Sequence, residues 1–98
     1  MSSNSGDLIE WNHDKNLHLK ETRDICFEDV LAAIQNDALV GDIRSDMPGR
    51  DNQRLLLVKL SGYIHVVPYV KTPRGKFLKT IYPSRKFNSV YGEKNEQI

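Results

Sequence analysis

Three β-like runs in the second half of the chain constrain its fold more than any other feature. The runs cover residues 54–60, 63–70 and 76–82. Ser61-Gly62 separates the first two runs and is typical of a two-residue hairpin turn. Thr72-Pro73-Arg74-Gly75 separates the last two, and its Pro followed by Gly favours a tight turn. Residues 53–86 therefore predict a meander of three antiparallel strands that ends in the basic cluster Pro83-Ser84-Arg85-Lys86.

The middle run predicts which side chains face the core, because a strand points alternate side chains to opposite faces. One face carries Tyr63, His65, Val67 and Tyr69, and the other carries Ile64, Val66, Pro68 and Val70. The second set is apolar throughout, so we expect it to face the core and His65 to lie on the more polar face. Pro68 has no N–H to donate, which predicts a bulge or a locally unpaired edge there.

The start of the chain predicts a short apolar element and then a polar helix. Leu8–Trp11 is either a strand or a capping segment. The helix is expected from Asp14 to about Thr22, capped by Asn12 or by Asp14 itself. Leu17 is its main apolar residue.

A second helix is expected over residues 27–34, and a third closes the domain. Phe27, Val30, Leu31 and Ile34 are spaced to form one apolar face. Cys26 is a possible cap of the second helix. Ser84 can cap the third, which runs from Arg85 to about Tyr91.

A strand over residues 38–43 and a loop over residues 45–52 complete the prediction. The order is β-α-α-β-β-β-β-α. This order is typical of an α+β domain whose mainly antiparallel sheet carries the two N-terminal helices on one face.

The length of 98 residues predicts one domain, which we place at residues 8–91, between a disordered tail at 1–7 and a polar tail at 92–98. No apolar run approaches the ~20 residues that span a bilayer, and the polar start does not resemble a secretory signal. A single cysteine, Cys26, fits a reducing cytoplasm. Three scattered histidines and the absence of a Gly-rich phosphate loop predict neither a metal site nor a cofactor.

Charge is divided unevenly along the chain. Residues 1–49 hold four basic and ten acidic residues, a net charge of −6, whereas residues 50–86 hold nine basic residues and one acidic residue, a net charge of +8. A basic half of this kind is suited to binding phosphates. The alternative is that these Lys and Arg side chains only solvate the outer face of a sheet.

Three groups of residues resemble the motifs of BrnT-family toxins. They are Ile9–Asn16 with its Glu-Trp and Lys15, Ile25–Val30 with its Phe-Glu pair, and the basic meander that ends in Pro83–Lys86. These toxins are small bacterial ribonucleases of type II toxin–antitoxin systems with a fold similar to RelE. The chain departs from the family where Thr22-Arg23-Asp24 stands in place of Lys-His-Gly.

The resemblance implies a metal-independent endoribonuclease that cleaves mRNA, on or off the ribosome, and arrests translation. It also implies a cognate antitoxin that covers the basic face and binds operator DNA. Such cleavage needs a base for the 2′-hydroxyl proton and cations for the crowded phosphorane. The candidate catalytic residues are Arg85, Arg54, Lys79, Lys86 and, by family position, Glu28. The candidate RNA-binding residues are Lys15, Arg74, Lys76, Tyr82, His65 and Ser84.

Several alternatives stay open at this point. Glu28 would also offset the helix dipole without any chemistry, and His65 would also serve as a surface pairing residue. Tyr82 is either a platform for an unpaired base or a packing residue. The same fold would also suit a toxin that blocks a target such as gyrase without cleavage, or an inactive partner of an antitoxin–DNA complex.

Overall fold

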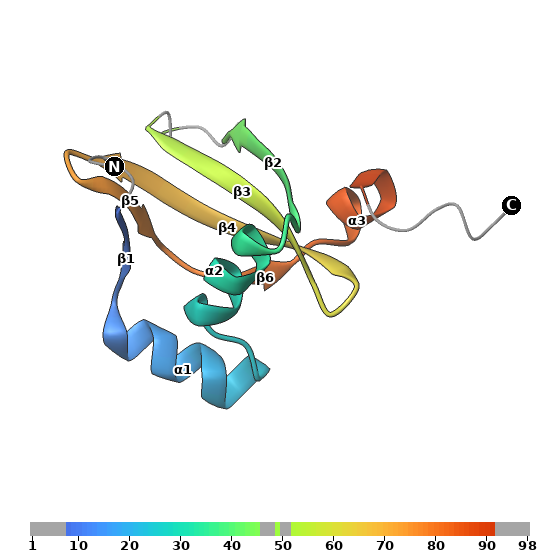
Figure 1. Cartoon of the computed structure of the whole chain (residues 1–98), viewed down its shortest axis with the longest axis horizontal. Helices are drawn as coiled ribbons and strands as arrows, with labels where there is room; N and C mark the ends of the chain where they lie inside the picture. Colours follow the sequence, from blue (N-terminus) through green and yellow to red (C-terminus); the bar gives the residue numbers. More distant parts are fainter. Residues whose placement is uncertain (1–7, 46–48, 50–51, 92–98) are drawn as a thin grey trace, which may run out of the picture.

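Residues 8–45, 49 and 52–91 are described by a computed structural model (Figure 1). Its elements are β1 Leu8–Trp11, α1 His13–Arg23, α2 Phe27–Gln35, β2 Leu39–Arg44, β3 Gln53–Leu60, β4 Tyr63–Thr72, β5 Gly75–Leu78, β6 Tyr82–Pro83 and α3 Arg85–Tyr91. The expected tails and most of the expected loop over residues 45–52 lie outside the described residues. None of the described helices is both long and apolar enough to cross a membrane.

One mixed sheet unites all six strands. The strand order is β1-β5-β4-β3-β2, with β6 paired to β4 beyond the end of β5. All pairs are antiparallel except β1–β5, in which Leu8 to Trp11 run parallel to Gly75 to Leu78. The structure therefore confirms an α+β protein with a mainly antiparallel sheet.

The β3–β4 hairpin follows the predicted turn. Ser61 has φ 55° and Gly62 has φ 80°. Positive φ at both central residues is the geometry that matches the right-handed twist of the flanking strands. Tyr63 accordingly pairs with Leu60, and the register continues without interruption to Val70 and Gln53.

The edge of β4 that faces away from β3 pairs with two strands, which meet it on either side of Pro68. β5 pairs with Tyr69 to Thr72, and β6 pairs with His65 and Val66. The carbonyl oxygen of Pro68 accepts a hydrogen bond from Lys79 N at 2.8 Å. The Pro68 nitrogen points to this same side, because N and C=O of one strand residue point the same way. Its missing N–H thus faces the gap between β5 and β6, as expected of a locally unpaired edge.

The third run of the meander was predicted to be one strand over residues 76–82, and that prediction is wrong. β5 ends at Leu78, residues 79–81 leave the sheet, and pairing resumes only at Tyr82–Pro83. The break follows from Pro68, which offers the passing chain an acceptor but no donor.

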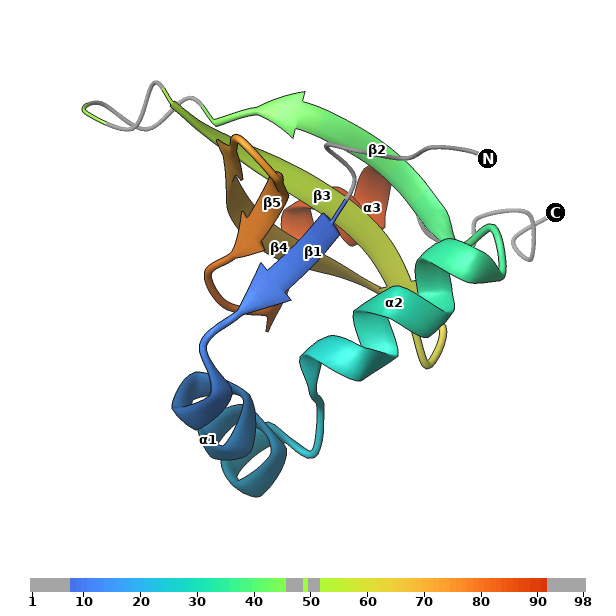
Figure 2. The same ribbon diagram turned by 60° about the vertical axis from the view of Figure 1, so that its left-hand side comes forward.

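The two faces of the sheet carry two apolar clusters. The larger one joins Leu19 of α1 and three residues of α2 to strand residues that include Val67 and Tyr69. The smaller one joins Leu57, Ile64 and Val66 to Phe87 of α3. Figure 2 shows α1 and α2 on one side of the sheet and α3 on the other.

The prediction that one face of β4 is polar and lies away from the core is therefore wrong. Val67 and Tyr69 are fully buried in the larger core, and Ile64 and Val66 are buried beneath α3. An alternation of apolar and polar residues identifies the core when only one face is covered, but here both faces of β4 are covered.

The first helix buries a different residue from the one expected. Leu19 is buried, whereas Leu17 is 47% exposed. Asn16 lies one turn before Leu19 on the same face and is also buried, because its Oδ1 accepts a hydrogen bond from Phe27 N at 2.7 Å. This contact with the start of α2 sets which face of α1 turns inward. Asn12 caps α1 by accepting from Lys15 N.

The second and third helices begin where they were predicted. In α2, Phe27 and Val30 are buried and Ile34 packs against the core. Cys26 is its N-cap residue, and Asp29 accepts from Cys26 N at 3.1 Å. Ser84 Oγ accepts from Phe87 N at 3.2 Å and so caps α3.

Candidate functional site: a basic cleft beside α3

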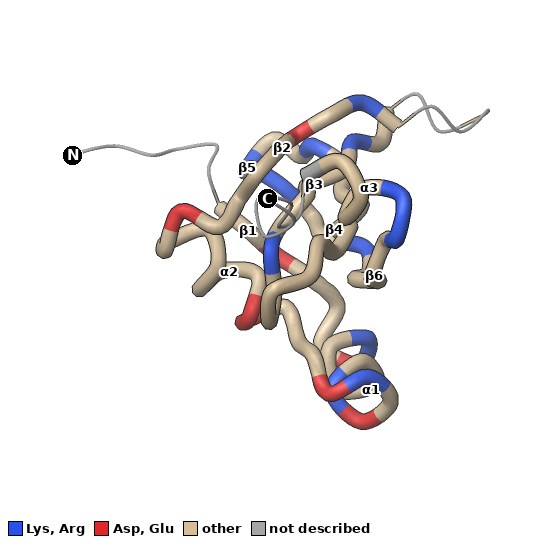
Figure 3. Tube along the Cα trace, turned by 90° about the vertical axis from the view of Figure 1, so that its right-hand side faces the viewer, with Lys and Arg blue, Asp and Glu red and all other residues tan. Residues whose placement is uncertain are grey.

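A cleft of about 450 Å³ opens between the 79–87 segment and the adjoining ends of β2 and β3. We call it the basic cleft. Its lining comprises Lys79, Thr80, Tyr82, Ser84, Lys86 and Phe87, together with Ile43, Arg44, Ser45, Gln53, Leu55 and Pro68. Lys79, Tyr82 and Lys86 are exposed, so their polar ends reach solvent at the rim. Figure 3 shows Lys and Arg along the strands, at the start of α3 and on α1, and most Asp and Glu on or beside α1 and α2.

Local structure brings the two cleft lysines together. Lys79 follows the end of β5 and is held by its backbone bond to the Pro68 carbonyl. Lys86 lies in the first turn of α3, which the Ser84 cap starts at that point. Each ammonium sits near an aromatic ring, Lys79 Nζ 5.7 Å from the Phe77 centroid and Lys86 Nζ 5.3 Å from the Phe87 centroid. Two cations from separate elements therefore border one hollow.

The floor of the basic cleft is apolar. Ile43, Leu55 and Phe87 belong to the smaller core cluster or pack against it, and Pro68 is buried beside them. Hydroxyl groups of Thr80, Tyr82 and Ser84 add polar groups to the same lining. Ammonium groups and hydroxyls above an apolar floor are suited to a ligand that carries phosphate and a flat apolar part.

The described residues that line the basic cleft include no Asp, Glu or His. The arrangement can therefore hold a phosphate and stabilise added negative charge on it. The described lining thus offers neither a carboxylate nor an imidazole to accept a proton.

Arg54 lies on the opposite face of the sheet from the cleft lysines. Its Nε donates to Asp42 Oδ1 and its Nη2 to the Asp42 carbonyl, both at 2.9 Å. The hydrogen bond to the Asp42 carboxylate, and then its charge, raise the pKa of Arg54. The structure thus pairs Arg54 with an anion of its own. A shared catalytic role would require Arg54 to lie near Lys79, Lys86 and Arg85, and the structure does not bring them together.

Tyr69 also binds the Asp42 carboxylate, from the buried side of the sheet. It is fully buried, and its hydroxyl donates to the Asp42 carboxylate at 2.9 and 3.0 Å. Burial, followed by the hydrogen bond to Asp42 and the charge of that carboxylate, raises the pKa of Tyr69 to about 12.

This pKa predicts a loss of stability in alkali. Because the folded pKa lies above the ordinary value of 10, folding favours the protonated phenol, and its contribution is complete below pH 10 and lost between pH 10 and 12. We expect the wild-type free energy of unfolding to fall by about 2 kcal/mol more than that of Tyr69→Phe over this range. Urea unfolding at pH 8, 10 and 12 measures the difference, and parallel pH curves for the two proteins would contradict it.

Glu28 lies at the junction of α1 and α2 rather than in the basic cleft. Its Oε1 accepts from Asn16 Nδ2 at 2.9 Å, and this bond is the largest cause of a lowered pKa of Glu28. Asn16 in turn accepts from Phe27 N. In this arrangement Glu28 orients the buried amide that joins the two helices. A lowered pKa also makes it a weaker base, so the geometry does not support its predicted catalytic role.

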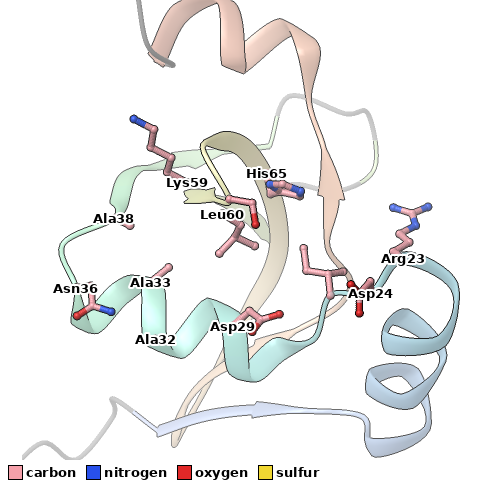
Figure 4. A pocket seen from close by; sticks show the side chains of 12 residues that line it. Arg23, Asp24, Asp29, Ala32, Ala33, Asn36, Ala38, Lys59, Leu60 and His65 are labelled. Atoms are coloured by element: carbon pink, nitrogen blue, oxygen red, sulfur yellow. The ribbon is translucent and has the colours of Figure 1, made fainter.

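His65 lines a second hollow, of about 570 Å³, between α2 and the β3–β4 hairpin (Figure 4). Its Nδ1 lies 2.9 Å from the Tyr63 carbonyl oxygen. A carbonyl oxygen only accepts, so Nδ1 is the donor in this contact. Strand alternation, however, puts His65 on the α2 face, opposite the basic cleft.

The remaining predicted residues are spread over the surface. Arg85 is the exposed first residue of α3 and does not line the basic cleft, although its neighbours Ser84 and Lys86 do. Lys15 lies in the first turn of α1. Arg74 pairs with Glu10 at 3.0 Å, and Lys76 Nζ lies 5.8 Å from the Tyr69 ring centroid.

Two basic residues of interest were missed from the sequence. Arg44 borders the basic cleft but belongs to the acidic half of the chain, so net charge along the sequence does not mark it. Arg23 donates from Nη1 to the Ile81 carbonyl at 3.1 Å and so ties α1 to the segment that leads to Tyr82. Nothing in the sequence pattern marks Arg23 for this contact, because Ile81 lies 58 residues away along the chain.

No protein-family model, curated protein or solved structure matches the chain.

Proposed function

We propose that this chain is the toxin component of a type II toxin–antitoxin system, with a RelE- or BrnT-like fold, and that its basic cleft binds and cleaves mRNA. A cognate antitoxin would neutralise it by covering the cleft and would bind operator DNA. The convergence of Lys79 and Lys86 on one hollow with an apolar floor is the observation that best supports this proposal. The motifs that resemble BrnT toxins supply the rest.

In the proposed reaction, an RNA 2′-hydroxyl attacks the adjacent phosphorus and loses its proton to solvent. The bond from phosphorus to the 5′-oxygen breaks, and that oxygen takes a proton from water. The products are a 2′,3′-cyclic phosphate and a 5′-hydroxyl. Lys79 and Lys86 would stabilise the additional charge on the phosphorane.

A non-catalytic toxin is the second candidate, and one observation favours it. The described cleft lining has no carboxylate or imidazole, and a positioned base typically contributes about 10²–10⁴-fold to such a reaction. A protein with this cleft could occupy RNA or another anionic target and block it without cutting.

Removal of both cleft lysines tests the proposal. We expect Lys79→Ala/Lys86→Ala to weaken RNA binding at least 10-fold and to lower the slope of log affinity against log salt by about 1.4, since each lost phosphate contact removes about 0.7. Cutting should fall about 100-fold or more. Primer extension on RNA incubated with the purified protein, with and without ribosomes, locates the cuts.

Lys20→Ala/Lys59→Ala is the matched control, because it removes two lysines that do not line the basic cleft. Equal losses in the two double variants would show a general charge effect and overturn the assignment of the cleft. Growth arrest in cells without cuts in any RNA would replace the ribonuclease by the blocking toxin.

A further inference from the structure

The sheet face opposite the basic cleft carries cations in register across four strands. Arg44 of β2 pairs with Arg54 of β3, and Lys71 of β4 pairs with Lys76 of β5. Tyr69 lies between the two pairs, because it is the register partner of Arg54 and stands two residues before Lys71. Paired residues and residues two apart share a face, so these side chains point to the same side. We call Arg44, Arg54, Lys71 and Lys76 the cation face; of these, Arg44 at the end of β2 also borders the basic cleft.

Like charges directly opposite each other destabilise a sheet. The cation face has two such pairs, and Asp42 is the only acidic partner that the described residues provide for it. Asp42 is engaged by Arg54 and Tyr69. Arg44 and Lys71 are exposed and have no described anionic partner. The face therefore holds a surplus of positive charge that the described part of the chain does not neutralise.

Buried and hydrogen-bonded groups lie beneath part of this charge. Tyr69 is fully buried and bonded to Asp42, which holds Arg54, while Lys76 lies over the Tyr69 ring. From β2 to β5 the face spans three strand spacings, or about 14 Å. A row of cations across strands, of which Arg54 and Lys76 are held by side-chain contacts, is suited to a ligand with repeated negative charges.

We propose that the cation face binds the phosphate backbone of RNA, as a contact separate from the basic cleft. This inference rests on the proposed function, because it assigns a second part of the same substrate. An RNA longer than the cleft would then be held on both sides of the sheet. Arg54 would serve mainly to anchor the face, and Arg44, Lys71 and Lys76 would meet the phosphates.

Two RNA lengths separate the two contacts. Fluorescence anisotropy would measure binding of a labelled trinucleotide, used as a short ligand for the cleft alone, and of a 15-nucleotide strand. For Lys71→Gln/Lys76→Gln, which removes two cations of this face that do not line the basic cleft, we expect about 5-fold or more weakening on the longer strand, a salt slope lower by about 1.4, and less than 2-fold change on the trinucleotide. Lys79→Ala/Lys86→Ala should weaken both, and Lys20→Ala/Lys59→Ala should weaken neither.

Each result decides between the two assignments. If Lys71→Gln/Lys76→Gln binds the longer strand as tightly as wild type does, the cation face is not an RNA contact, and the proposal is overturned even if that face binds an acidic protein instead. If this variant binds the longer strand more weakly while Lys79→Ala/Lys86→Ala binds both RNAs as wild type does, the cation face is supported and the basic cleft is rejected as an RNA site. If the wild-type protein binds neither RNA, both the cation face and the basic cleft are rejected as RNA-binding sites. Unfolding midpoints equal to wild type exclude loss of fold as the cause.

Discussion

Replacement of Gly75 by alanine is expected to destabilise the protein by at least about 3 kcal/mol. Gly75 begins β5 with φ 153°, a backbone conformation that side chains disfavour. A Cβ atom built there would overlap the backbone of Leu8, including its carbonyl oxygen. Leu8 pairs with Gly75, and its N–H donates to the Arg74 carbonyl at 3.0 Å. Because backbone cannot rotate away as a side chain can, the parallel β1–β5 pairing must open.

Gly62→Ala is the matched control for this prediction. Gly62 also has positive φ, 80°, but a Cβ there would meet nothing within 4 Å. Gly62→Ala should lower the free energy of unfolding by about 1 kcal/mol, which is the cost of the backbone conformation without a steric overlap. Urea unfolding measures both variants, and hydrogen exchange of the Leu8 to Trp11 amides reports whether β1 has detached. Equal losses at Gly75 and Gly62 would show that β1 does not lie against β5 as described.

Truncation of Phe27 to alanine should remove about 3–5 kcal/mol of stability. Phe27 is fully buried in the larger core, and its ring stacks on Trp11 with 5.4 Å between centroids. The lost ring would leave a cavity among α1, α2 and the sheet. Such a loss is a large part of the ~5–15 kcal/mol that holds a domain folded.

Thermal and urea unfolding would measure this effect beside Val90→Ala, whose side chain is 59% exposed and should change stability by less than about 0.5 kcal/mol. Phe27→Leu keeps most of the volume and should fall between the two. A loss below about 1 kcal/mol for Phe27→Ala would mean that this ring is not part of the main core.

Features of the fold that depend on neighbouring residues could be predicted from the sequence. Ser61-Gly62 carries its turn preference in two residues, and the apolar spacing from Phe27 to Ile34 lies within one helix. The break at Lys79 was not predictable in the same way. It arises because Pro68 stands opposite that segment, and this depends on the register between β4 and β5.

The same distinction between local and tertiary determinants applies to the candidate site. Lys79, Tyr82, Ser84 and Lys86 lie within eight residues, so one local segment brings them to the basic cleft. Arg54 and Glu28 come from elements whose facing side is set by tertiary contacts, with Asp42 for Arg54 and Asn16 for Glu28. Basic composition alone does not report which face of a sheet a side chain takes.

The parallel pairing of β1 with β5 also has a consequence for synthesis of the chain on the ribosome. Leu8–Trp11 emerges early, yet its partner Gly75–Leu78 is translated more than 60 residues later. Contacts this distant in sequence form late, since a long loop must close first. Until then Phe27 has no complete core to enter. Lys79 and Lys86 follow the last strand that β1 requires, so an unfinished chain acquires the basic cleft only after almost the whole core is available.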